Sequence, residues 1–155
     1  MKLQIDISNA QQDDLSIILQ LQKDCYITEA EIHDDYDIPP LHQDLNSIKN
    51  DYNDMTILKG QINGQIVASV RGYEKDGTCY IGRLIVSKEF QNKGIGRLLM
   101  DSIEFNFMDC NRFELYTGFK SQKNLYLYNK LGYKEFKRQK INDKLTLVYL
   151  EKINQ

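Results

Sequence analysis

Hydrophobic residues recur along the chain with two different spacings, and each spacing predicts one kind of element. Leu3, Ile5 and Ile7 alternate with polar residues, which is the pattern of a half-buried strand. Two aliphatic runs, 55–62 and 65–74, are joined by Asn63-Gly64, the dipeptide that most strongly favours a tight hairpin. The strands predicted in this way cover residues 3–7, 55–62, 65–74, 79–86, 113–116, 136–138 and 145–151.

A spacing of three to four residues between apolar positions predicts the helices. Within residues 13–26, Leu15, Ile18 and Leu19 begin such a stripe behind a first turn that carries carboxylates. We expect 29–40 to be an irregular linker, because Pro39-Pro40 cannot lie inside a helix. Further helices are expected over residues 41–48, 95–107 and 121–131, the last of them closed by Gly132.

The order of these elements predicts the fold class. Strand-helix-strand units need parallel crossovers, whereas hairpins need antiparallel pairs. We therefore expect an α/β (mixed α+β) fold with a central mixed sheet of six to seven strands and helices on both faces. The 155 residues contain no internal repeat and no linker to a second domain, so 1–155 is expected to be a single domain. A chain of this length buries about 70% of the surface that it exposes when unfolded.

Charge and composition narrow the classes of function. The net charge of -2 and the pI near 5.7 argue against a nucleic-acid partner, because such proteins usually carry a basic face. No apolar stretch has secretory or membrane-spanning length, so we expect a cytoplasmic protein with no membrane partner. Three scattered cysteines and two histidines form no metal-ligand motif, so no metal site is expected.

The strongest candidate for a ligand site follows the strand 79–86. The run Gln91-Asn92-Lys93-Gly94-Ile95-Gly96-Arg97 opens a helix, where free N–H groups and the helix dipole favour an anion. A dinucleotide fingerprint would need a third glycine where Leu99 stands, and no Walker-type Gly-Lys-Ser/Thr ending is present. The pattern Gln-x-x-Gly-x-Gly that remains resembles the coenzyme A pyrophosphate loop of the GCN5-related N-acetyltransferase (GNAT) family.

A second pattern supports the same resemblance. Residues 121–133 end in Leu127-Tyr128-Asn129-Lys130-Leu131-Gly132-Tyr133, similar to the family's later helix with its Leu-Tyr-x-Lys-x-Gly-Phe/Tyr ending. The two motifs stand in the family's order and at its usual separation, and the predicted order of elements matches its fold. The resemblance implies an N-acetyltransferase that uses acetyl-CoA as co-substrate without a metal. The resemblance also makes a homodimer possible, because dimers are common in this family.

The resemblance assigns a role to each residue of the two motifs. The backbone of Leu84 and Val86 would bind the pantetheine arm, and Tyr128 would be the general acid that protonates the leaving thiolate. Asn124 would also bind the pantetheine arm, although many relatives have their asparagine where Ser121 stands here. The pyrophosphate would be held by Gln91, Asn92, Lys93, Gly94, Ile95, Gly96 and Arg97, mostly through backbone N–H groups.

The general base and the acceptor stay open. Some relatives carry a glutamate where Tyr80 stands, so Glu29, Glu31, His33 and Glu74 are the remaining candidates for the base, unless they are solvated surface groups. Residues 24–54 hold nine acidic side chains against one basic. Around Glu29, Glu31 and His33 these carboxylates would attract a small cationic amine, unless they only solubilise a loop.

Three functions are compatible with these residues. We expect direct attack by a small primary amine on acetyl-CoA, because no cysteine has a basic partner that would make it an acyl carrier. The first alternative is a non-catalytic acyl-CoA sensor or interaction domain, which the missing glutamate at Tyr80 favours and the retained Tyr128 disfavours. The second alternative is an acetyltransferase that acts on protein lysines or N-termini.

Overall fold

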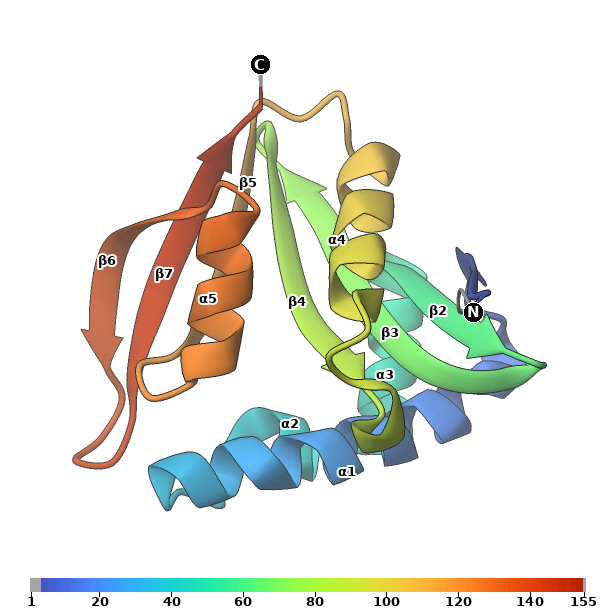
Figure 1. Cartoon of the computed structure of the whole chain (residues 1–155), viewed down its shortest axis with the longest axis horizontal. Helices are drawn as coiled ribbons and strands as arrows, with labels where there is room; N and C mark the ends of the chain where they lie inside the picture. The colour runs from blue at the N-terminus through green and yellow to red at the C-terminus, as the bar shows by residue number, and fades with distance from the viewer. Residues whose placement is uncertain (1–3, 155) are drawn as a thin grey trace.

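One mixed sheet organises the chain. The computed structural model describes residues 4–154 and places seven strands in the order β1-β2-β3-β4-β5-β7-β6 (Figure 1). Neighbouring strands are antiparallel except β4 and β5, which are parallel. The strands are β1 (Asp6–Asn9), β2 (Thr56–Ile62), β3 (Gln65–Lys75), β4 (Thr78–Val86), β5 (Arg112–Gly118), β6 (Lys134–Lys140) and β7 (Thr146–Ile153).

Helices cover both faces of the sheet, as the order of elements predicts. Helices α4 (Ile95–Asn106) and α5 (Gln122–Lys130) pack their apolar side chains into one core, with Leu99 and Tyr128 among the buried residues. Helices α1 (Leu15–His33) and α3 (Leu45–Asp54) enclose a second core, which includes Ile18 and Ile48. The four-residue helix α2 (Pro39–His42) connects them. The mixed fold is confirmed, with the higher of the two expected strand numbers.

The first helix is longer than predicted. The sequence prediction ended it near Tyr26 and made 29–40 a linker, but α1 continues to His33. Ala30 and His33 are buried and extend the apolar stripe by two turns. The helix ends at Asp34, whose φ of 50° is left-handed and ends the helical path five residues before the prolines. The part of the first predicted strand at Leu3 lies outside the described residues.

The parallel strands β4 and β5 pair only at their beginnings. Their register runs from Thr78 opposite Arg112 to Tyr80 opposite Glu114. Beyond Tyr80 the two strands diverge (Figure 1), although β4 runs on to Val86 and β5 to Gly118. We call the region between residues 81–86 of β4 and 115–118 of β5 the splay. A strand edge that has lost its neighbour presents N–H and C=O groups to whatever fills the space.

Helix α1 crosses below the splay and contacts both of its sides (Figure 1). On the β4 side, the Cys25 thiol donates a hydrogen bond to the Val86 carbonyl at 3.4 Å. On the β5 side, His33 Nε2 accepts one from the Lys120 N–H at 3.2 Å. Just after the helix, Asp35 accepts a hydrogen bond from the Asn142 side chain at 2.8 Å. These contacts tie one rigid element to both diverging strands.

A buried polar network fixes α1 and α3 on the sheet. The Arg71 guanidinium on β3 donates to Gln22 at 2.5 Å, to Gln43 at 3.0 Å and to Asp51 at 2.9 Å. Gln22 in turn donates to the Pro40 carbonyl at 2.9 Å, which holds the start of α2. Because a buried polar group without a partner is costly, these bonds specify how the three helices sit.

We predict that Gly118→Ala destabilises the protein by about 1–3 kcal/mol, the usual cost of overpacking. A Cβ at Gly118 would overlap the His33 ring, which lies directly on this glycine. The matched control is Gly82→Ala on β4, where a Cβ meets no heavy atom within 4 Å. Urea unfolding followed by circular dichroism measures both variants. Equal stability of the two would contradict the close packing of α1 on β5.

Candidate active site

The predicted anion turn begins a helix with free backbone donors. Gly94 precedes α4 with φ of 81°, a conformation that favours glycine, and a Cβ there would stand in open space. The first helical hydrogen bond runs from the Leu98 N–H to the Gly94 carbonyl at 3.2 Å. The N–H groups of Ile95, Gly96 and Arg97 therefore lie ahead of the helical ladder, where they can bind an anion.

The other residues of the turn are open to solvent or hold the loop. Asn92, Lys93 and Arg97 are exposed, and Asn92 has a left-handed φ of 63°. The Gln91 side chain donates a hydrogen bond to the Val86 carbonyl at 3.0 Å, which closes the loop onto the end of β4. Gly96 lies against Leu127, with 3.4 Å between a Cβ built there and the leucine Cδ2. This glycine lets α4 and α5 approach each other next to the splay.

The backbone at the end of β4 points into the splay. Ser87 N–H donates to the Val67 carbonyl at 2.7 Å, so the backbone groups of Ser87 face β3. Because the direction of these groups alternates along a strand, those of Val86 face the splay. Leu84 lies in the bulged stretch of β4, where it has no partner residue in the register with β3. The Val86 carbonyl already accepts hydrogen bonds from Gln91 and Cys25. Leu84 and Val86 thus present an edge to which an extended amide chain can bond.

Tyr128 lies on α5 at the side of the splay opposite Leu84 and Val86. Its side chain is only 7% exposed, and its ring meets Tyr133 edge to face at 6.1 Å between centroids. Burial raises the pKa of Tyr128 well above its usual value, and the neighbouring Tyr26 and Glu29 raise it further. The phenol therefore keeps its proton at neutral pH and can donate it.

Glu29 is the acidic residue of α1 that reaches across to α5. Its carboxylate accepts hydrogen bonds from the Ser121 hydroxyl and from the Asn124 amide, the latter at 3.4 Å. Asn124 also donates to the Thr117 hydroxyl at 3.2 Å. A carboxylate has about four acceptor positions, so Glu29 keeps capacity for a further proton or donor. The structure thus brings Glu29, Asn124 and Tyr128 together, as a carboxylate, an amide and a phenol at one end of the splay.

The other candidates for a base are placed differently. Both ring nitrogens of the buried His33 are occupied, because Nε2 accepts from Lys120 and Nδ1 donates to the Glu29 carbonyl at 3.0 Å. Glu31 is exposed on α1. Glu74 pairs with Cys79 at the beginning of β4, where β4 and β5 are still close. Glu29 is therefore the candidate with both position and free acceptor capacity.

Two residues near the splay carry no sequence motif. Tyr26 of α1 is half-buried; burial raises its pKa to about 12, Arg83 lowers it, and Tyr116 and Glu29 raise it. Arg83 stands in a β-bulge, since two residue steps along β3 match three along β4 between Ser69–Arg71 and Gly82–Ile85. Its φ of 52° is left-handed although it is not glycine. A bulge at a non-glycine residue leaves no pattern in the sequence.

The cysteines are not poised for chemistry. Burial raises the pKa of the Cys25 thiol to about 11 and that of Cys79 to about 12, and it also raises that of Cys110. All three thiols therefore stay protonated at neutral pH and are poor nucleophiles. Within residues 4–154, no group of three acidic, cysteine or histidine side chains could hold a metal ion. No helix in that range is long and apolar enough to cross a membrane.

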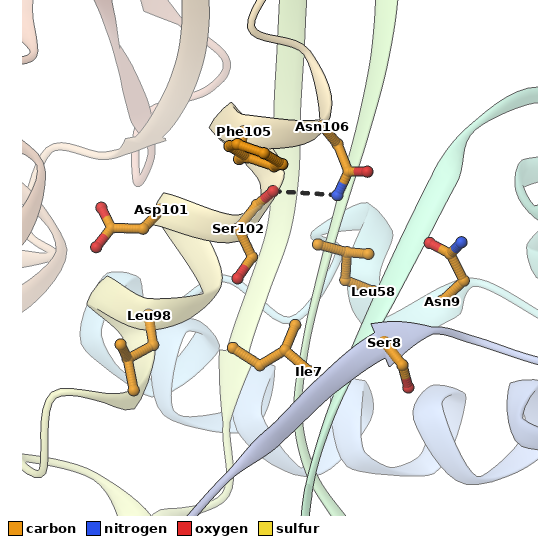
Figure 2. Close-up of a pocket in the computed structure, with 9 residues that line it drawn as sticks. All are labelled: Ile7, Ser8, Asn9, Leu58, Leu98, Asp101, Ser102, Phe105 and Asn106. Atoms are coloured by element: carbon orange, nitrogen blue, oxygen red, sulfur yellow. Dashed lines mark hydrogen bonds between the residues drawn. The ribbon is translucent and has the colours of Figure 1, made fainter.

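A hollow of about 560 Å³ lies away from this cluster, between the edge strand β1 and helix α4 (Figure 2). Ile7 and Leu58 form its floor, and the exposed Phe105 stands at its rim. It contains none of the predicted site residues. The open backbone groups, Tyr128 and Glu29 all belong to the splay, which makes the splay the candidate active site.

Comparison with known families agrees with the two sequence motifs. The family model described as acetyltransferase (GNAT) family matches residues 15–133. This range includes the anion turn, Glu29 and Tyr128. No curated protein matches the sequence. The resemblance inferred from the motifs is confirmed.

Solved structures share the fold at low sequence identity. The ribosomal-protein-S18-alanine N-acetyltransferase from Escherichia coli is 12% identical with a TM-score of 0.80, over 98% of this chain and 95% of that one. PaiA N-acetyltransferase from Thermoplasma acidophilum, in complex with coenzyme A, is 14% identical with a TM-score of 0.81, over 97% and 99%. YncA, a putative acetyltransferase from Salmonella typhimurium with acetyl-CoA, is 16% identical with a TM-score of 0.77, over 98% and 95%.

Proposed function

The chain belongs to the acetyltransferase (GNAT) family, and we propose that it transfers the acetyl group of acetyl-CoA to a primary amine by direct attack. The observation that carries the proposal is the splay. It joins an unpaired strand edge, a helix start with free N–H groups and a protonated phenol in one place. We also propose that residues 1–155 act as one catalytic domain.

The pyrophosphate and the pantetheine arm of coenzyme A can each be matched to unpaired polar groups that follow one another along the loop and β4. A pyrophosphate suits the N–H groups of Ile95, Gly96 and Arg97, with Asn92, Lys93 and Gly94 along the same loop. The side chains of Lys93 and Arg97 add positive charge there. The amides of a pantetheine arm can bond the backbone of Leu84 and the N–H group of Val86 as a neighbouring strand would. Gln91 holds that edge in place, and Asn124 can bond the arm with its free carbonyl oxygen.

Three proton transfers complete the reaction. The cationic amine gives one proton to Glu29, directly or through a water, and the neutral nitrogen bonds to the acetyl carbon. The nitrogen then loses its second proton to solvent. The carbon–sulfur bond breaks, and Tyr128 donates its proton to the departing sulfur. Solvent returns a proton to Tyr128 and removes one from Glu29. Because all three cysteine thiols stay protonated, the amine attacks without an acyl-enzyme.

Glu29 also gives the acceptor a place for its amine. The acidic segment does not converge on the splay as a group, because Glu31 and Asp34 are exposed and Asp35 accepts hydrogen bonds from Asn142 and Asp37. Glu29 alone of these carboxylates contacts α5. We therefore propose a small primary amine that enters from the α1 side, with its cationic nitrogen at Glu29. The contact between Glu29 and α5 favours an enzyme over an acyl-CoA sensor, which needs no base.

We predict that Tyr128→Phe lowers kcat about 100-fold or more, the usual share of general acid catalysis, while the affinity for acetyl-CoA stays unchanged. Phenylalanine keeps the ring that packs on Tyr133 and removes only the proton donor. Tyr126→Phe is the control, because Tyr126 is an exposed tyrosine on the same helix. Thiol release with a panel of amines measures both.

The pH profile adds a second readout to this experiment. Since burial raises the pKa of Tyr128, the group stays protonated to beyond about pH 10, the ordinary tyrosine value, and causes no alkaline loss of kcat below it. A Tyr128→Phe variant as fast as wild type would remove the general-acid role. Tight coenzyme binding with no turnover of any amine would instead support the sensor.

We predict that Gly94→Asp weakens coenzyme A binding about tenfold or more, an effect of roughly 1.4 kcal/mol. The new carboxylate would repel the pyrophosphate and strain a left-handed backbone. Gly64→Asp is the matched control, because Gly64 has a similar φ of 79° and equal open space but lies in the β2–β3 hairpin. Titration calorimetry compares them. Equal affinity of the two variants would argue against the turn as the pyrophosphate site.

A further inference from the structure

Arg83 is a cation without a counter-charge on the acceptor side of the splay. It makes no hydrogen bond and no ion pair with any described residue, and its Nε atom is buried. A buried guanidinium N–H that has left water without finding an acceptor is unfavourable. The residue is nevertheless held in a left-handed bulge conformation, which is itself costly. Among the described residues, the Arg83 guanidinium therefore has a buried N–H donor without an acceptor.

The neighbouring Arg71, unlike Arg83, has partners for its charge among the described residues. It is 2% exposed, and its terminal nitrogens bond Asp51, Gln43 and Gln22. The carboxylate of Asp51 is therefore engaged with Arg71. Burial and the adjacent charge of Arg83 lower the pKa of Arg71 to about 10, although Asp51 acts to raise it. Asp51 is the ion-pair partner of Arg71 and not of Arg83, so the region has room for one more negative charge.

A pocket lies in front of Arg83. It has a volume of about 300 Å³, the lower end of the range for small-molecule sites. Its other lining residues come from α2 and the start of α3, and they are Pro39, His42, Gln43, Asp44 and Ser47. The Asp44 carboxylate caps α3 by accepting from the Ser47 N–H at 2.8 Å, and it forms no ion pair with Arg83. The His42 Nε2–H group donates a hydrogen bond to the Tyr36 carbonyl at 2.7 Å.

The pocket adjoins the proposed site of acetyl transfer. Arg83 belongs to residues 81–86 of β4, the stretch that borders the splay. On the other side, Tyr26 and Glu29 lie three residues apart on one face of α1, and the charges of Arg83 and Glu29 both act on the Tyr26 hydroxyl. An acceptor that lies along this face can bring one end to Glu29 and the other to Arg83. Its two ends would need opposite charges.

Resting on the acetyl transfer proposed above, we propose that Arg83 binds a carboxylate of the acceptor. The acceptor is then amino-acid-like, with its amine at Glu29 and its carboxylate in the pocket between β4, α2 and α3. Guanidinium and carboxylate match as a planar, two-point pair, which fixes the orientation of the amine as well as its affinity. This refines the expectation of a purely cationic amine: a polyamine would leave Arg83 without a partner.

Kinetics with matched acceptors test the assignment. Glycine, lysine and phenylalanine are compared with their amides, and putrescine serves as the cation without an anion. Wild type is expected to favour at least one amino acid over its amide by about tenfold to a hundredfold in kcat/KM, the range for a hydrogen bond to a charged group. Arg83→Gln should abolish that ratio and Arg83→Lys should restore part of it. Arg138→Gln, at an exposed arginine on β6, should leave it unchanged.

Equal or better use of amides or putrescine by wild type would overturn the proposal. So would an Arg83→Gln variant that keeps the ratio. Circular dichroism of the variant confirms its fold, and the ratio is internal to each protein, so it does not depend on the active fraction.

A binding measurement separates this proposal from the acetyl transfer itself. In the presence of coenzyme A, the 15N–1H signal of the Arg83 Nε group is followed by NMR and assigned by its loss in Arg83→Lys. N-acetylglycine should shift this signal, and neutral N-acetylglycinamide should not. No shift with either compound, or equal shifts with both, would overturn the proposal. A selective shift without turnover of any amine would keep the anion site and refute the acetyl transfer.

Discussion

The structure depends on the parallel strands β4 and β5, which pair at their beginnings and then separate. β4 and β5 are joined over three residue pairs and then diverge, which leaves part of β4 without a neighbour. Unpaired backbone is tolerated inside a domain only where something else holds the flanking elements in place. Here α1 holds both strands in place. Its Cys25 bonds Val86 at the end of β4, and its His33 bonds Lys120 just after β5. The Arg71 network anchors α1 to β3.

In the proposed reaction, one opening serves two substrates from opposite sides. The face with α4 and α5 offers free N–H groups and an open strand edge, which suit a phosphate with an extended amide arm. The face with α1 offers Glu29 and Arg83, two opposite charges that both act on Tyr26. Tyr128 lies where the two approaches meet. Helix α1 positions Glu29 and also packs against both strands that border the splay. A change in the packing of α1 should therefore affect both the stability of the protein and the proposed reaction.

Local patterns in the sequence predicted what local geometry determines. The glycine turn and the hairpin at Asn63-Gly64 depend on residues close together in the chain, and they agree with the structure. The apolar stripes predicted that helices form but missed bounds, since α1 continues to His33 and the helix expected over 41–48 is divided into α2 and α3. Glu29 appeared only as one of four candidate bases, because its contact with Ser121 joins residues 92 positions apart. Arg83 was not predicted as a site residue at all. Its proposed role rests on a bulge in β4 and on the absence of a hydrogen-bond or ion-pair partner among residues 4–154, which no periodicity in the sequence records.

Amide hydrogen exchange tests the central claim, that the splay is where acetyl-CoA binds, most directly. On addition of acetyl-CoA, the N–H groups of Leu84 and Val86 and those of residues 94–97 should exchange more slowly, because the coenzyme replaces water at each of them. Amides of the β2–β3 hairpin at Asn63 and Gly64 should exchange as before. Unchanged exchange at β4 and the start of α4, with protection at the hollow between β1 and α4 instead, would contradict the account.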